Sequence, residues 1–464
     1  MPDAALRRGD FGNALNANGT LQRIYDPMSV PITSASPGRL QFADNVIPAA
    51  RIHPIARRIL DVYYPLPNVE GTGAGALTNN YREVQRNTTD RHNVDVKLNW
   101  NRTGAHQIWG KVSHMDARIN DRHVFPFPTT SEAGARTDVW NYAAGQTLTL
   151  GPTLTMDGSV GVATMYTSAK SSDTFMGMLG LDLGIPGTND QGRGDDRYAG
   201  LPRFNTGFSA IGDAVGFIPT TRDDTTFSGT FNVTKVAGQH ELKSGYSTTR
   251  MTLEHWNPEG ANPRGLFNFA SNATRTFGTG SQTANFYNQH AAFLLGLVGS
   301  ANRSIQHELF TVREWQHALY VRDRWNVNSK LTLDLGLRWE YYPIMNRANR
   351  GMERLDLDTL DVLLGGVGGN PQSVGLTAAK DHFAPRIGGV YRLNDDTVVR
   401  SGYGLAFESR PWAQNFRGHA SYPLAINANF ETPAAASQFG WYGTLEQGIP
   451  FVAGPDTSSG RVRL

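Results

Sequence analysis

Residues 331–342 have the sequence LTLDLGLRWEYY, and this stretch decides the fold. Apolar side chains from Leu331 to Tyr341 alternate with polar ones from Thr332 to Glu340. Strict alternation predicts a β-strand with one apolar and one polar face, because successive side chains of a strand point to opposite sides. The stretch is also long enough to cross a bilayer as a tilted strand, for which about 9–11 residues suffice.

The same alternation recurs along much of the chain. Val94, Val96 and Leu98, for example, alternate with Asp95 and Lys97. We predict ten strands from this pattern, and we take the segment that ends near Val327 as one long strand. The predicted strands are 90–100, 105–117, 137–150, 153–168, 223–236, 239–256, 302–327, 331–342, 382–393 and 397–408.

The connections between these strands alternate in length. Five strand pairs are joined by tight turns that place Gly, Pro, Asn or Asp where a hairpin prefers them. Short turns at one rim and long loops at the other are typical of outer-membrane barrels, whose turns are periplasmic and loops extracellular. The sequence therefore predicts an all-β fold, an antiparallel transmembrane β-barrel that is partial. The turns are 101–104, 151–152, 237–238, 328–330 and 394–395, and the long connections are about 118–138, 169–222, 257–301 and 343–381.

This topology divides the chain into three regions. Residues 90–408 are predicted to form the barrel strands, while 1–89 and 409–464 are extracellular loop regions, the second of them truncated. A chain that starts and stops in outer loops does not close its barrel. We therefore expect a curved, open sheet with one lipid-facing side, or a smaller barrel.

Two loop segments have helical features. A short helix is predicted at 53–64, where Ile55, Ile59 and Leu60 recur at helical spacing between two prolines. The apolar run at 286–297 fits either a helix or a buried strand.

Composition excludes several classes of protein. Lys plus Arg (43) nearly balances Asp plus Glu (41) in the 464 residues, so no basic face favours a nucleic-acid partner. The chain has no cysteine, which excludes disulfides and thiolate zinc sites. No apolar run approaches the roughly 18 residues of a membrane helix. The first residues, MPDAALRRGDFGN, lack the apolar core of a signal peptide, so we expect any export signal to lie outside this chain.

Four stretches resemble the barrels of Oar-like TonB-dependent receptors. They are DNVIPAARIHPIARRILDVYYPLPN (44–68), LGIPG (183–187), ALYVRDRWNVNSKLTLDLGLRWEYY (318–342) and HFAPRIGGVYRLNDDTVVRSGYGLAFE (382–408). The resemblance covers most of residues 1–410. It implies a Gram-negative outer-membrane receptor whose barrel has 22 strands. It also implies a signal peptide, a regulatory β-sandwich, a TonB box and a plug before the barrel, which are not in this sequence. The chain is therefore expected to be a fragment.

No motif for covalent chemistry is found. His240-Glu241 and His307-Glu308 begin like a zinc-protease motif, but neither has the second histidine. The glycine run at 71–75 follows no strand, so a linker is favoured over a phosphate-binding loop. We therefore predict no enzyme, no catalytic residue, no cofactor and no metal.

Two acidic clusters were weighed as calcium sites because oxygen-rich loops bind this ion. The first lies in the longest loop, 169–222, and a solvated loop is the favoured interpretation there. The second has the spacing of a helix face or a turn and is interpreted in the same way. The clusters are Asn189, Asp190, Asp195 and Asp196, and Asp356, Asp358 and Asp361.

Aromatic and charged residues of the strands are assigned to different surfaces. Aromatic residues near strand ends are interpreted as an interfacial girdle, with ligand stacking as the alternative. Charged residues of the polar face are predicted to face the lumen, where they contact a plug or water. The aromatic residues are Trp100, Trp109, Trp140, Tyr142, Trp325, Trp339, Tyr341 and Tyr342. The polar-face residues are Asp95, Lys97, Asp334, Arg338, Glu340, Arg386, Arg392 and Arg400.

Two functions fit these observations. The first is the barrel segment of a TonB-dependent receptor that takes up a large or scarce ligand, such as a glycan, a peptide or a metal chelate. Its partners would be outer-membrane lipid, the TonB system through a plug outside this sequence, and an unknown extracellular ligand. The second is a soluble or surface β-rich module for carbohydrate binding or adhesion. A propeller of this kind would show a repeat of about 40 residues, and none is found.

Overall fold

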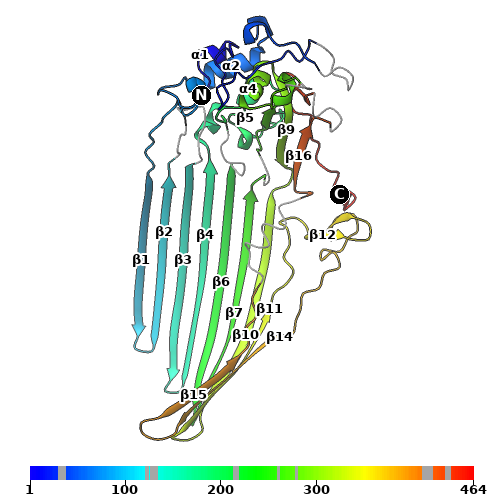
Figure 1. Ribbon diagram of the computed structural model, residues 1–464. Coiled ribbons are helices and arrows are strands. Elements are labelled where there is room, and N and C mark those ends of the chain that lie inside the picture. The colour runs from blue at the N-terminus through cyan, green and yellow to red at the C-terminus, as the bar shows by residue number, and fades with distance from the viewer. Residues whose placement is uncertain are drawn as a thin grey trace.

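The structure, a computed structural model, describes residues 1–29, 38–120, 125, 134–212, 219–258, 262–276, 281–409, 422–433 and 440–463. Its largest element is a ten-stranded antiparallel sheet in which neighbours in sequence are neighbours in space (Figure 1). The strands in order are β1 Thr89–Thr103, β2 His106–Ile119, β3 Gly134–Gly151, β4 Leu154–Lys170, β6 Thr220–Ala237, β7 His240–Trp256, β10 Phe310–Asn326, β11 Leu331–Tyr341, β14 His382–Arg392 and β15 Val398–Gly404.

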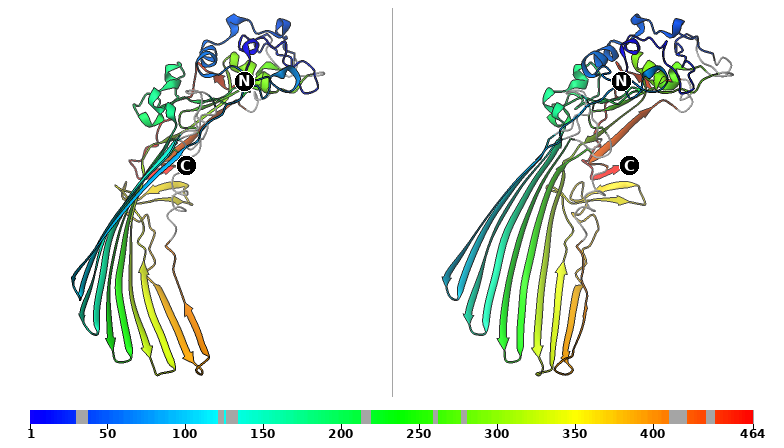
Figure 2. Two further views of the ribbon diagram at one scale, coloured as in Figure 1. Left: turned by 90° about the vertical axis from the view of Figure 1, so that its left-hand side faces the viewer. Right: turned by 60° about the vertical axis from the view of Figure 1, so that its left-hand side comes forward.

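Each of the ten predicted membrane strands has a counterpart in the large sheet, which confirms the predicted fold class, although only the second part of 302–327 belongs to that sheet. Most of their ends lie within three residues of the prediction, although β15 ends at Gly404 instead of 408. Apolar side chains share one face as the alternation requires, since Leu337 pairs with Val321 of β10 and Leu335 pairs with Ile387 of β14. The sheet curls along its width, with β1 and β15 at its two edges (Figure 2).

The tight turns all lie at one end of the sheet, here called the turn rim. The long connections gather at the other end, here called the loop rim (Figure 1). The single strand predicted at 302–327 is wrong. The chain instead forms β9 (Leu297–Gln306), breaks at 307–309, and then forms β10. The break separates β10, in the large sheet, from β9, which belongs to another sheet. Arg303 of β9 is buried, and its guanidinium donates to the carbonyl of Pro263 at 3.2 Å.

Beyond the loop rim the chain folds into a compact module, here called the cap. It comprises the described parts of 1–88, 171–219, 257–306 and 425–449, and it leans over the side toward which the sheet curls (Figure 2). Its sheet has the strand order β16-β9-β8-β5, and β17 also pairs with β9. Its strands besides β9 are β5 Arg203–Asn205, β8 Leu266–Phe269, β16 Ala425–Glu431 and β17 Gly443–Thr444. Its helices are α1 Ala4–Arg7, α2 Pro54–Tyr63, α3 Leu179–Asp182 and α4 Phe286–Leu294, with the 3-10 helices η1 Ala43–Asn45, η2 Ala49–Arg51, η3 Ala74–Ala76, η4 Ser172–Met176, η5 Asp196–Tyr198 and η6 Ser271–Thr274.

One hydrophobic core holds the cap together. The helix predicted at 53–64 is α2, and its apolar face buries Ile59 and Leu60. The apolar run at 286–297 is α4 followed by the first residue of β9, and Phe293 and Leu294 are buried in the same core. Segments far apart in sequence thus share one interior, and this interior orders connections that alternation alone describes as loops.

The described residues of 409–464, a region predicted as a truncated loop, form three strands. Besides β16 and β17 it supplies β18 (Arg461–Arg463), which completes a small sheet with β12 (Glu353–Asp356) and β13 (Asp361–Leu364). The sequence does not predict these strands, because strands of two to seven residues carry little alternation.

An ion-pair network ties this small sheet to the beginning of β10. The buried Arg347 pairs with Glu353 at 2.6 Å, and its guanidinium lies 4.3 Å from the ring centroid of Phe310. Arg350 bridges Glu308 (2.7 Å) and Glu353.

Candidate functional site

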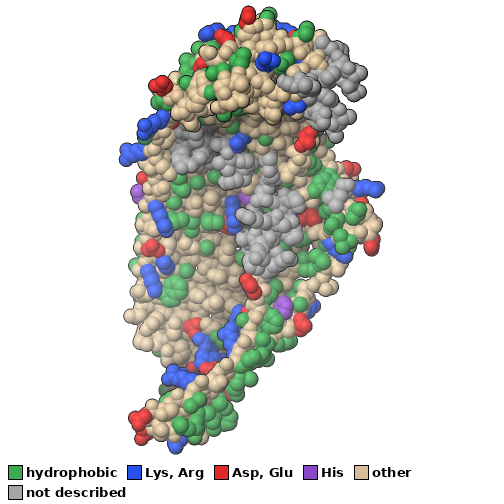
Figure 3. Space-filling view, viewed as in Figure 1, with side chains coloured by type: hydrophobic (Ala, Val, Ile, Leu, Met, Phe, Trp, Pro, Cys, Tyr) green, Lys and Arg blue, Asp and Glu red, His purple; other side chains and the backbone are tan. Residues whose placement is uncertain are grey.

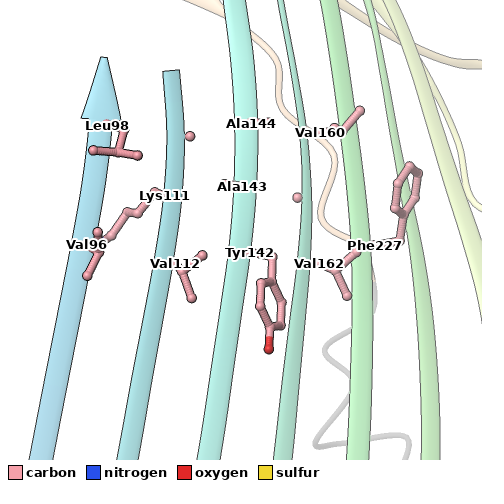
Figure 4. A pocket seen from close by; sticks show the side chains of 12 residues that line it. Val96, Leu98, Lys111, Val112, Tyr142, Ala143, Ala144, Val160, Val162 and Phe227 are labelled. Carbon is pink, nitrogen blue, oxygen red and sulfur yellow. The ribbon is translucent and has the colours of Figure 1, made fainter. Parts of the chain in front are cut away.

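The convex face of the large sheet is apolar. One cross-strand row runs from Val96 through Val112, Tyr142 and Val162 to Phe227, each on a neighbouring strand (Figure 4). These residues line a shallow cavity of about 400 Å³ whose floor includes Gly110 and Ala144. Leu98 on this face is 72% exposed and Trp100 is 59% exposed. Contiguous apolar exposure of this extent marks a surface that contacts another apolar phase.

Most aromatic side chains of this convex face lie toward its ends, but Tyr142 lies midway along β3, in the row of Val96. Of the eight residues predicted to form a girdle, six share the face with Val96 and Leu335: Trp100, Trp140, Tyr142, Trp325, Trp339 and Tyr341. The prediction is wrong for Trp109 and Tyr342. Trp109 is on the opposite face under Lys97, whose Nζ is 5.5 Å from the ring, and Tyr342 packs on His382 at 5.7 Å.

Two clusters of the same composition lie on the convex face at opposite ends of the strands. Near the loop rim, His114 stacks on Trp140 at 4.0 Å and contacts Asp138 at 3.2 Å. At the turn rim, His240 stacks on Trp325 at 5.3 Å and contacts Asp323 at 2.7 Å. In each, an Asp-x-Trp sequence faces a histidine of the adjacent strand. Amphipathic rings with polar partners suit a membrane–water interface.

The concave face carries the charged residues predicted to face the lumen. Asp95 pairs with Lys111 at 3.0 Å and accepts a hydrogen bond from Ser113 at 2.6 Å. Arg338 pairs with Glu340 at 2.7 Å. Figure 3 shows Lys, Arg, Asp and Glu side chains on the face toward which the sheet curls. The sheet therefore separates an apolar surface from a charged one, as a barrel wall must.

Two residues of the acidic cluster in the longest loop, Asn189 and Asp190, hold the local backbone of the cap by hydrogen bonds. Asn189 is fully buried; its side-chain oxygen accepts from Gly180 (2.9 Å), and its amide donates to the carbonyl of Gly200 (2.8 Å). The carboxylate of Asp190 accepts from the amides of Gly192 (2.8 Å) and Asp195 (2.9 Å). The favoured interpretation as a solvated loop is therefore wrong for these two residues.

The other motifs lie in secondary structure and turns. Asp356 and Asp361 flank the β12–β13 turn, and the carboxylate of Asp356 accepts from the amide of Asp358 at 3.1 Å. His240 lies in β7. Glu308 lies in the break between β9 and β10 and forms an ion pair with Arg350. In the described ranges no three His, Asp or Glu side chains are arranged to hold a metal ion. Within those ranges, no helix has the length and hydrophobicity to cross a membrane.

A buried ion pair fastens two segments of the cap. The guanidinium of Arg264 and the carboxylate of Asp173 are 3.1 Å apart, with side-chain exposures of 0% and 6%. Arg264 also donates to the hydroxyl of Ser171 at 2.6 Å, and Asp173 accepts from the amide of Leu201 at 2.8 Å. The connection 171–201 is thus held by a buried polar network, which alternation in the strands does not reveal.

A sheet with one apolar face, one charged face, hairpin turns at one rim and a folded cap at the other defines the class: a membrane β-barrel protein. Residues 1–463 match the family model described as the outer membrane beta barrel domain, and the chain belongs to this family. It is accordingly a protein of the Gram-negative outer membrane. A search of curated proteins gave no match.

Several solved barrel structures are similar at low identity. The ferric-catecholate import receptor Fiu of E. coli K12, in its open form, has a TM-score of 0.35 and 10% identity over 68% of this chain and 46% of its own. The siderophore receptor PiuA of Acinetobacter baumannii has a TM-score of 0.34 and 9% identity over 68% and 42%. The translocator domain of autotransporter NalP from Neisseria meningitidis has a TM-score of 0.23 and 9% identity over 74% and 79%. The chain spans less than half the length of the two receptors.

Proposed function

We propose that this chain is the barrel portion of an Oar-like TonB-dependent receptor that takes up a large or scarce solute across the outer membrane. The observation that carries the proposal is the arrangement of one sheet. It has an apolar convex face, a charged concave face, and a folded cap over the concave side. On this account the turn rim is periplasmic and the loop rim, with the cap, is extracellular.

The cap is the part that meets an extracellular ligand first. Its sheet has an apolar side with Phe204 and Phe267 in the core, and a polar side with Asn205, Asn268 and Ser300 in one row. Asn205 donates to Asn268 at 2.6 Å, and Asn268 donates to Ser300 at 3.0 Å. A cavity of about 320 Å³ lies beside this row. Amides and hydroxyls on a rigid sheet offer hydrogen bonds to a polar ligand.

Binding and release in such a receptor involve no covalent chemistry, so the proposal assigns no catalytic residue. Energy would come from the inner membrane through TonB and a plug encoded outside this sequence. The ligand classes that fit are a glycan, a peptide or a metal chelate.

The test is expression of the complete reading frame in a Gram-negative host with and without a functional TonB. We expect the protein in the outer-membrane fraction and ligand accumulation that stops when TonB is removed. Uptake that persists without TonB would contradict energy coupling. Recovery of a folded, monodisperse protein without detergent would contradict the barrel itself.

A further inference from the structure

The concave face carries an arginine-rich groove where β10, β11, β14 and β15 approach the turn rim. Two cavities of about 380 and 460 Å³ lie along it and share Arg322 and Asp334, so they form one continuous surface, here called the basic groove. Blue side chains gather in this lower part of the sheet in Figure 3. The groove is lined by Arg322, Arg324, Arg338, Arg386 and Arg400, and Asp334 is the one carboxylate in its lining.

Only part of this positive charge is neutralised by nearby carboxylates. Arg322 pairs with Asp334, and Arg338 pairs with Glu340. Arg324 lies between Glu241 of β7 and Asp334 of β11 in one cross-strand row. Arg386 and Arg400 are exposed and make no ion pair or hydrogen bond with the residues that the structure describes. The guanidinium groups of Arg386 and Arg400 therefore keep all their donors for another partner.

The strand register places these arginines around glycine positions, which have no side chain to fill the groove. Gly336 lies between Arg322 and Arg386 in one cross-strand row, so the two arginines are two strand spacings apart, about 10 Å. Gly388 and Gly402 continue the floor in the next row. A Cβ built at Gly388 or Gly402 would approach no atom closer than 3.5 Å, so packing does not require glycine there. The glycines instead leave space for a ligand to reach the backbone.

We propose that the basic groove binds a small solute that carries several carboxylate or phosphate groups. Guanidinium forks match both oxyanions in planar, two-pronged hydrogen bonds, and their spacing favours a ligand with separated anionic groups. A neutral sugar would leave the cluster of like charges unrelieved. The inference rests on the proposed function, because it names the class of solute that passes along the concave face.

Binding of trimesate, a planar tricarboxylate, and of pyrophosphate to the detergent-solubilised chain tests this directly by calorimetry. Variants Arg386→Gln and Arg400→Gln are each expected to weaken binding of both probes by about tenfold. The matched control is Lys97→Gln, which removes a positive charge from the same face of β1, far from the groove. The control is expected to bind as the parent chain does.

The outcomes separate this inference from the proposed function. Failure of both probes to bind, or equal weakening in Lys97→Gln, would overturn the groove as a specific anion site. Binding of an acidic peptide such as poly-glutamate with no binding of either small anion would also overturn it, in favour of a protein surface. Intact anion binding by a protein whose uptake is independent of TonB would contradict the proposed function and leave the groove in place.

Discussion

At the scale of single residues, the side chains of one strand meet two different solvents. Leu337 is 43% exposed on the convex face, while its neighbours Gly336 and Arg338 are on the concave face. In the proposed barrel Leu337 faces hydrocarbon, so its exposure is favourable in a bilayer and costly in water.

The variant Leu337→Arg is therefore expected to destabilise the barrel by about 2–4 kcal/mol in lipid, because a cation would be placed in the apolar band. Leu337→Ile, which keeps volume and polarity, is the control and should cost less than about 1.5 kcal/mol. Denaturant titration in liposomes, followed by heat-modifiable gel mobility, measures both. Equal stability of the arginine variant and the parent would place Leu337 in water.

His290 makes the cap sensitive to acid. It lies on α4 against the rings of Phe208 (5.0 Å) and Phe293 (5.7 Å), and burial lowers its pKa to about 3. An unfolded cap binds a proton at this histidine near pH 6.5, whereas the folded cap does not until about pH 3. Its contribution to stability is thus complete above pH 6.5 and is lost as pH falls toward 3.

We expect the midpoint temperature of cap unfolding to fall as the pH is lowered from 7 to 4. Tryptophan fluorescence reports this unfolding. The variant His290→Leu should flatten this dependence, and His92→Leu, at an exposed position of β1, should leave it unchanged. An identical pH profile in His290→Leu would show that other groups control acid unfolding.

At the scale of elements, the alternation predicts strands well and the cap poorly. Each membrane strand must present one face to lipid, so its period of two is imposed along its whole length, as in 331–341. The cap has no such constraint. Its core is assembled from pieces such as Ile24, Ile185 and Leu445, whose contacts are set by tertiary packing and carry no local pattern.

The same reason explains the mistake at 302–327. Both β9 and β10 have strand-like sequence, but they belong to different sheets, and the break between them depends on long-range contacts. His307, for example, donates its amide to the carbonyl of Leu424 at 2.7 Å. The charged concave positions were predictable from parity, whereas the basic groove depends on which strands become neighbours.

The ion pair between Asp173 and Arg264 is expected to hold the connection 171–201 in place. Asp173→Ala would leave a buried guanidinium unpaired and destabilise the cap by about 3–5 kcal/mol. The double variant Asp173→Ala/Arg264→Met removes both charges and should recover part of this loss. Hydrogen exchange at 171–201 measures the effect, and unchanged protection in the single variant would show that the pair does not hold this segment.

At the scale of the whole molecule, the cap and the sheet differ in where their apolar side chains lie. The sheet exposes apolar side chains on its convex face and has charges on its concave face, while the cap buries its apolar side chains as a water-soluble domain does. The boundary between the two falls at the loop rim, where His114 and Trp140 form one interfacial cluster. Membership of the outer membrane beta barrel family agrees with this division.

The central claim, that this sheet is a membrane wall with lipid on its convex face only, is tested most directly by a cysteine scan. The chain has no native cysteine, so single substitutions from Thr332 to Glu340 can be labelled without background. After reconstitution of the protein in lipid, bimane at the odd positions Leu333, Leu335, Leu337 and Trp339 is predicted to be quenched by lipid-borne nitroxide and spared by aqueous iodide. Bimane at the even positions is predicted to show the reverse. Loss of the two-residue period, or iodide quenching at the odd positions, would contradict the account.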